Sequence, residues 1–162
     1  MHPSIVEFPA LRLVGLRAFG RLEELPVRVP PAWRELVTRA PAIAGRLEPG
    51  IFYGAMPEAH HLGAPLDGVY IYWVAVRIAP DAPFPKGLGQ LLIPAGRYAQ
   101  ATVTGTADQI DPTYLGLAGW MTGNGLTPVP DRWALERYDE ARMSVVPPYE
   151  RFDYEVLRPI LG

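Results

Sequence analysis

Glu136 is a carboxylate in the middle of a short apolar and aromatic run, Trp133–Glu140. The run follows Pro128, Pro130 and Asp131, and this pattern predicts a β-strand that begins after a turn. A carboxylate within an internal strand is costly to bury without a partner, and neighbouring aromatic rings cannot provide a positive charge. The residue types therefore indicate a pocket that suits a cationic ligand.

The strand pattern also predicts which side chains accompany the carboxylate. Side chains two residues apart on a strand share a face, so Glu136 is expected beside Ala134 and Tyr138. In the alternative interpretation the strand lies at a sheet edge, where Glu136 is solvated and Arg137 or Arg142 neutralises it. This stretch of sequence alone leaves both interpretations open.

Length and composition limit the classes of protein. The 162 residues fit one ordinary domain, or two small halves that share a core, and the 49% hydrophobic and 20% charged content is typical of a soluble globular protein. A net charge of -2 argues against a nucleic-acid-binding surface, and the absence of cysteine excludes disulfides, thiolate metal sites and a cysteine nucleophile. No leader pattern or membrane-length apolar segment is found, so we expect a cytoplasmic protein without a membrane or nucleic-acid partner.

Other residues that could support chemistry occur in unfavourable settings. His60 and His61 are adjacent in a loop, and neighbouring side chains rarely converge on one ion, so no metal site is expected. Ser4 and Ser144 lack a nucleophile motif, and the 87–89 segment Gly-Leu-Gly is too short for a phosphate-binding loop. We therefore expect no cofactor.

The periodic segments predict an α+β fold. Trp33, Leu36, Val37 and Ala40 have helical spacing, and we expect their helix to open at the Pro30-Pro31 pair. A second helix is expected over 112–122, with Asp111 as its cap. Strands are expected at 11–19, 51–55, 69–76, 97–104, 133–140 and 152–157.

The same order of elements occurs twice. Each half, about 1–85 and 86–162, has the order strand-helix-strand-strand. This order predicts a tandem duplication, with a cleft where the halves meet. Residues that fall against each other in the two halves are Tyr53 with Tyr138, and Tyr70, Tyr72 and Val74 with Phe152, Tyr154 and Val156.

Several of these segments resemble the GyrI-like effector-binding family. The likeness extends from Val6 to Ile160 and depends on the order and spacing of the pieces. The pieces are Leu135-Glu136-Arg137-Tyr138, Phe152-Asp153-Tyr154-Glu155-Val156, Pro94-Ala95-Gly96-Arg97-Tyr98-Ala99, Gly105 and the helix with Trp120.

The resemblance implies two strand-helix-strand-strand units that form a curved antiparallel sheet with two main helices and a cleft at the internal two-fold. Members of the family are ligand-sensing domains of AraC-like and MerR-like regulators, proteins similar to the gyrase inhibitor, binders of multiple cationic lipophilic drugs, and hydrolases that open cyclopropane rings. Because the family-like region fills the chain, we expect a single domain over 1–162 without a DNA-binding helix-turn-helix.

The family's central glutamate matches Glu136. Its aromatic cleft positions match Tyr53, Trp73, Tyr98, Trp120 and Tyr138, although each of these rings would also suit ordinary core packing. The leading hypothesis is a free-standing protein that binds amphipathic, cationic or aromatic small molecules, with Glu136 as the counter-charge.

Two alternatives stay open. In a cyclopropane-opening hydrolase, Glu136 would act as general acid or base, with Tyr138 or Tyr98 positioning the substrate. In the other alternative the chain modulates DNA gyrase, or another regulator, through a protein contact. The sequence does not separate binding from turnover.

Overall fold

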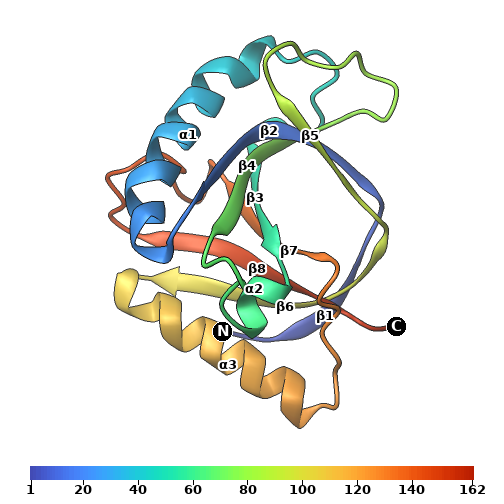
Figure 1. The fold of residues 1–162 in the computed structure, drawn as a ribbon, viewed down its shortest axis with the longest axis vertical. Helices are drawn as coiled ribbons and strands as arrows, with labels where there is room; N and C mark the ends of the chain where they lie inside the picture. The colour runs from blue at the N-terminus through green and yellow to red at the C-terminus, as the bar shows by residue number, and fades with distance from the viewer.

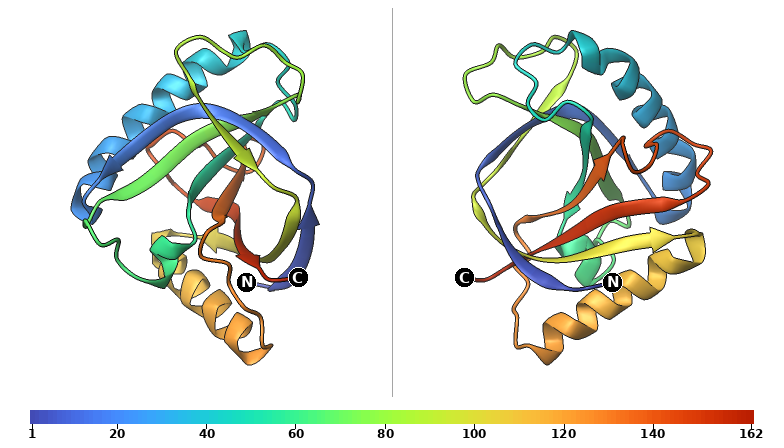
Figure 2. Two further views of the ribbon diagram at one scale, coloured as in Figure 1. Left: turned by 45° about the vertical axis from the view of Figure 1, so that its right-hand side comes forward. Right: turned by 180° about the vertical axis from the view of Figure 1, so that it is seen from behind.

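The computed structural model describes residues 1–162 as an eight-stranded antiparallel sheet with two long helices against one face (Figure 1). The sheet curls into a half-barrel (Figure 2). The strands are β1 (Ser4–Phe8), β2 (Leu11–Gly20), β3 (Ile51–Pro57), β4 (Tyr70–Ile78), β5 (Gly89–Ile93), β6 (Gly96–Gly105), β7 (Trp133–Asp139) and β8 (Phe152–Ile160). The α-helices are α1 (Leu25–Arg39), α2 (Ala59–Leu62) and α3 (Ile110–Gly123), and the short 3-10 helices are η1 (Leu22–Glu24), η2 (Ala40–Ala42) and η3 (Ala107–Gln109).

Strand β7 lies in the middle of the sheet. It pairs with β3 on one side and with β8 on the other, so Glu136 is aligned with Gly54 and with Val156. The expectation of an internal strand is confirmed, and the edge-strand alternative is wrong. The α+β class, the curved antiparallel sheet and the two main helices are also confirmed.

The strand order is symmetric about the β3–β7 pair. From this pair outwards, the order is β3-β4-β2-β5 on one side and β7-β8-β6-β1 on the other. Each half also places its long helix after β2 or β6. This symmetry agrees with the expected repeat, whereas a common origin of the halves stays a prediction.

Helix α1 begins earlier than the sequence pattern indicates. The expected start at Pro30-Pro31 is wrong, because the helix begins at Leu25 and both prolines lie inside it. Pro26 occupies the first turn, where a missing N–H has no intrahelical partner to lose. The sequence thus contained an earlier proline that could open the helix.

Helix α3 extends two residues further upstream than expected. Gln109 occupies the N-cap position, and Asp111 lies in the first turn instead of capping the helix. A carboxylate there still interacts favourably with the positive end of the helix dipole. None of the helices has both the length and the apolar character needed to cross a bilayer.

Two hydrophobic clusters occupy the two faces of the sheet. We call the side packed by α1 and α3 the helix face, and the opposite side, inside the half-barrel, the inner face (Figure 2). Alternation along each strand assigns neighbouring residues to different faces, as with Val74 on the helix face and Trp73 on the inner face. The sheet therefore separates two chemical environments.

A buried ion pair connects the residue after β3 to strand β8. The guanidinium of Arg158 donates from Nε to both carboxylate oxygens of Glu58, at 2.6 and 3.0 Å, and its Nη2 lies 2.5 Å from Oε1. Glu58 is 0% exposed and Arg158 is 5% exposed. Removing one partner would leave the other charge buried and unpaired.

We predict that Glu58→Leu lowers the free energy of unfolding by about 3–5 kcal/mol, because Arg158 loses its only buried counter-charge. Urea denaturation followed by circular dichroism would measure the loss. The double variant Glu58→Leu/Arg158→Met is the control and should lose much less, since it leaves no orphan charge. Equal losses in the two variants would contradict this account.

Candidate functional site

Glu136 is held by two tyrosine hydroxyls. Tyr72 on β4 donates to Oε1 at 2.6 Å, and Tyr114 on α3 donates to Oε2 at 2.5 Å. No lysine, arginine or histidine forms an ion pair with this carboxylate. The site therefore holds an acidic group whose hydrogen-bond partners are neutral phenols.

The two arginines that could have neutralised Glu136 pair elsewhere. Arg137 follows it on β7, points to the inner face, and approaches Glu48 at 3.9 Å. Arg142 binds Asp153 and Glu155, each at 2.5 Å. The interpretation in which Arg137 or Arg142 balances Glu136 is therefore wrong.

Gly54 leaves the space in which the carboxylate and a phenol meet. It lies opposite Glu136 in the β3–β7 register. A Cβ at this position would lie 2.0 Å from the Tyr72 hydroxyl and 3.0 Å from Oε1 of Glu136. Any side chain here would displace the Tyr72–Glu136 hydrogen bond.

Aromatic rings surround the position of Glu136. Tyr138 stacks on Tyr154 with ring centroids 4.7 Å apart, and Trp33 of α1 meets Tyr138 edge-on at 5.5 Å. A cavity of about 140 Å³ adjoins these rings. Its lining is entirely apolar or aromatic and consists of Val29, Trp33, Tyr72, Tyr138, Met143, Val145, Tyr149, Phe152 and Tyr154.

Burial keeps the phenols protonated. Desolvation first, and the nearby Glu136 carboxylate second, raise the pKa of Tyr72, Tyr114 and Tyr138 well above the ordinary value. The same two causes raise the pKa of Tyr154. These hydroxyls therefore stay available as hydrogen-bond donors across the physiological pH range.

The short helix α2 covers Tyr114. The His61 ring stacks on the Tyr114 ring at 5.9 Å with an interplanar angle of 20°. Burial, followed by the positive charges of Arg158 and His60, lowers the pKa of His61 to about 4. The imidazole that covers Tyr114 is thus neutral at neutral pH.

Three of the expected aromatic residues lie on the other face of the sheet. Tyr53, Trp73 and Tyr98 belong to the inner-face cluster, whereas Glu136 and Tyr138 point to the helix face. The expected grouping of these three rings with Glu136 in one cleft is therefore wrong. The physical reason is strand alternation, because Tyr53 is adjacent to Gly54 and Trp73 is adjacent to Tyr72.

Trp120 is on the correct face but away from the carboxylate. It packs against the helix-face cluster from α3, and it lies six residues beyond Tyr114, or about 9 Å along the helix axis. The residues that sequence reasoning missed are Tyr72 and Tyr114. The repeat alignment contained a signal for Tyr72, because it matched this residue to Tyr154.

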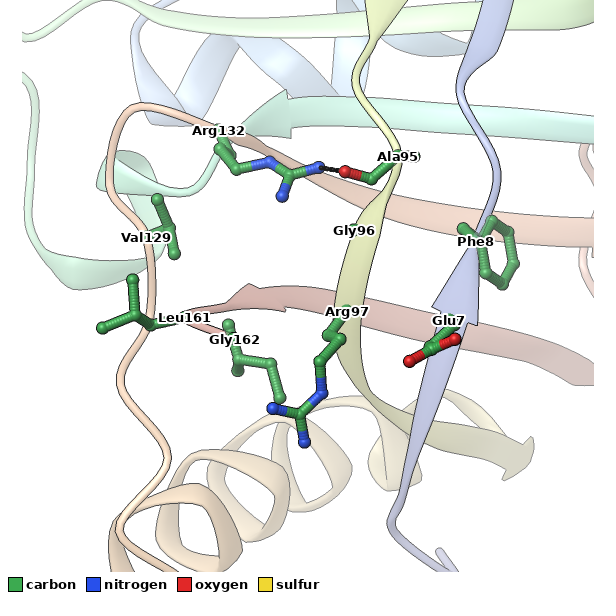
Figure 3. A pocket seen from close by; sticks show the side chains of 10 residues that line it. Glu7, Phe8, Ala95, Gly96, Arg97, Val129, Arg132, Leu161 and Gly162 are labelled. Carbon is green, nitrogen blue, oxygen red and sulfur yellow. Dashed lines mark hydrogen bonds between the residues drawn. The ribbon is translucent and has the colours of Figure 1, made fainter.

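Another cavity lies away from Glu136. It measures about 530 Å³ and lies beside β1, the start of β6 and the end of the chain, as Figure 3 shows. Arg132 projects over it and donates to the carbonyl oxygens of Pro94 and Ala95 at 2.7 and 3.3 Å. None of the residues that contact Glu136 lines this cavity.

The amino-acid sequence matches a protein-family model. A model described as the GyrI-like small molecule binding domain matches residues 1–161. The transcriptional regulator BrlR of Pseudomonas aeruginosa is 30% identical over 114 residues, which are 70% of this chain and 39% of BrlR. The chain thus spans well under half the length of this relative.

Solved structures share the fold. The structure of SAV2435 bound to tetraphenylphosphonium has a TM-score of 0.68 at 14% identity, covering 100% of this chain and 95% of that one. The C-terminal domain of EcmrR has a TM-score of 0.68 at 13% identity, covering 99% and 98%. At such identities the likeness concerns the fold alone.

We predict that Gly54→Ala breaks the Tyr72–Glu136 hydrogen bond and lowers the free energy of unfolding by about 1–3 kcal/mol, because the new methyl group overlaps the phenol. Chemical denaturation would measure this change. The control is Gly119→Ala in α3, where nothing lies within 4 Å of the added carbon and stability should rise by about 0.4–1 kcal/mol. If Gly54→Ala and Gly119→Ala had equal free energies of unfolding, the steric role of Gly54 would be contradicted.

We predict a loss of stability in mild acid that depends on His61. Its folded pKa of about 4 lies below the ordinary 6.5. The contribution of His61 to the free energy of unfolding is therefore fully present above pH 6.5 and is lost as the pH decreases towards 4. The loss is on the order of 2 kcal/mol after allowance for partial exposure. Unfolding free energies between pH 7 and pH 4 should fall less steeply in His61→Phe, and an unchanged slope would contradict the assignment.

Proposed function

Because the chain belongs to the GyrI-like small molecule binding domain family, we propose that its ligands are aromatic, lipophilic cations that bind at the helix face against Glu136. In this proposal residues 1–162 act as one binding domain. The observation that carries the proposal is the internal-strand carboxylate with two phenol partners and no cationic partner.

The electrostatics of the site favour a positive ligand. In surroundings poorer in water than bulk solvent, a carboxylate attracts a cation more strongly than it would in water. The absence of an internal ion pair means that a ligand does not have to displace a protein cation first. A ligand that brings a diffuse charge would also lose little hydration on entry.

The surrounding rings add a second attraction. The rings of Trp33, Tyr138 and Tyr154 lie together beside the cavity. Cation-π contacts within about 6 Å contribute roughly 0.5–2 kcal/mol each. Stacking against these rings favours flat aromatic groups over branched aliphatic ones.

The cavity must widen to accept such a ligand. Its 140 Å³ is smaller than the roughly 300–1,000 Å³ of typical sites for drug-sized molecules. Met143, Val145 and Tyr149 form one wall from the loop between β7 and β8, and Tyr72 separates the cavity from Glu136. We propose that this loop and the Tyr72 ring shift when a ligand enters.

The comparison with SAV2435 supports the ligand class. That protein was solved bound to tetraphenylphosphonium, a lipophilic aromatic cation, and its fold covers the whole of this chain. The inference to this chain depends on Glu136 and its surrounding rings, since the two sequences are only 14% identical.

We predict that Glu136→Gln weakens the binding of tetraphenylphosphonium at least tenfold, equivalent to about 1.4 kcal/mol, because the counter-charge is lost. Binding of the uncharged aromatic triphenylphosphine oxide should change less than threefold. Isothermal titration calorimetry would measure both affinities.

The matched control is Glu140→Gln, which removes the same charge from an exposed residue just after β7. It should leave both affinities unchanged. Equal losses for the cation and the neutral compound in Glu136→Gln would show that the site does not recognise charge.

A further inference from the structure

We propose a second ligand site on the inner face, directly behind the Glu136 site, that binds a small zwitterion with one carboxylate and one ammonium group, as in a free amino acid. The site is a cavity of about 390 Å³ between β1, the loop before β3, and the inner faces of the central strands. Its polar lining consists of Glu7, Glu48, Tyr53, Arg77, Gln100, Arg137 and Glu155.

Two guanidinium groups at this cavity have unused donors. Arg77 and Arg137 approach Glu48 at 3.8 and 3.9 Å, which is too far for hydrogen bonds. Arg77 donates no side-chain hydrogen bond, and Arg137, which also lies close to the Tyr53 hydroxyl, leaves most of its five N–H donors free. With side chains 24% and 28% exposed, both can reach a carboxylate in the cavity.

An unused acceptor lies beside these donors. Glu155 is aligned with Arg137 in the β7–β8 register and binds Arg142 through Oε1 at 2.5 Å. Its Oε2 atom is buried and has no hydrogen-bond partner. A buried carboxylate oxygen without a donor is costly, so an ammonium group at this position would satisfy it.

The mixture of charges selects against simpler ligands. A plain anion would meet the three carboxylates of the lining, and a plain cation would meet Arg77 and Arg137. A zwitterion places each of its charges beside the opposite charge of the protein. Gln100 adds an amide that can bond to either end.

Part of the site is already fixed in position. The Tyr53 hydroxyl donates to Oε2 of Glu48 at 2.9 Å, and Tyr53 is itself buried. Burial, and then the Glu48 charge, raise the pKa of Tyr53 to about 12, so the phenol remains a donor. Glu48 also holds a left-handed backbone with φ of 53°, a conformation that is uncommon outside glycine.

The test titrates the full-length protein with L-glutamine by isothermal calorimetry. Two capped derivatives of L-glutamine test the two charges separately. N-acetyl-L-glutamine keeps only the carboxylate, and L-glutamine amide keeps only the ammonium group. We expect L-glutamine to bind with a Kd below 1 mM and each capped compound to bind at least tenfold more weakly. A capped compound that binds as well as L-glutamine, or no heat with L-glutamine at 10 mM, would overturn the proposal.

Variants locate the binding. Arg137→Gln and Arg77→Gln should each lower the affinity for L-glutamine at least fivefold. Glu136→Gln, on the other face, should leave this affinity unchanged. Circular dichroism and thermal unfolding confirm that each variant is folded. Unchanged affinity in both arginine variants would overturn the assignment, and tetraphenylphosphonium binding, measured separately, reports on the first site alone.

Discussion

The energetic cost of an acid inside a sheet shapes the centre of this molecule. Glu136 has no protein cation beside it, so its oxygens depend on the hydroxyls of Tyr72 and Tyr114. These partners come from β4 and from α3, and Gly54 on β3 leaves the room they need. Three elements distant in sequence therefore have to meet at one carboxylate, and the symmetric strand order brings them to the middle of the sheet.

The alternation of side chains along the strands gives the two faces different chemistry. The helix face carries one acid among aromatic rings, whereas the inner face carries arginines and carboxylates that pair with one another. Strand alternation turns Arg137 away from Glu136, and Asp153 and Glu155 bind Arg142. The isolation of the helix-face charge is thus a property of the whole sheet.

The amino-acid sequence predicted much of the fold and part of the site. The internal strand, the shared face of Glu136 and Tyr138, and the resemblance to the GyrI-like family followed from residue patterns and were confirmed. The positions of Tyr53, Trp73 and Tyr98 did not follow, because strands that are apolar on both faces give no signal for which face meets the helices. Tyr114 lies within the helix expected over 112–122, but only tertiary packing turns its hydroxyl towards the carboxylate.

Glu136 and Arg137 are joined by a single peptide unit, yet they face opposite sides of the sheet. The sheet therefore acts as a partition one backbone thick, and consecutive residues of β7 present an anion to one side and a cation to the other.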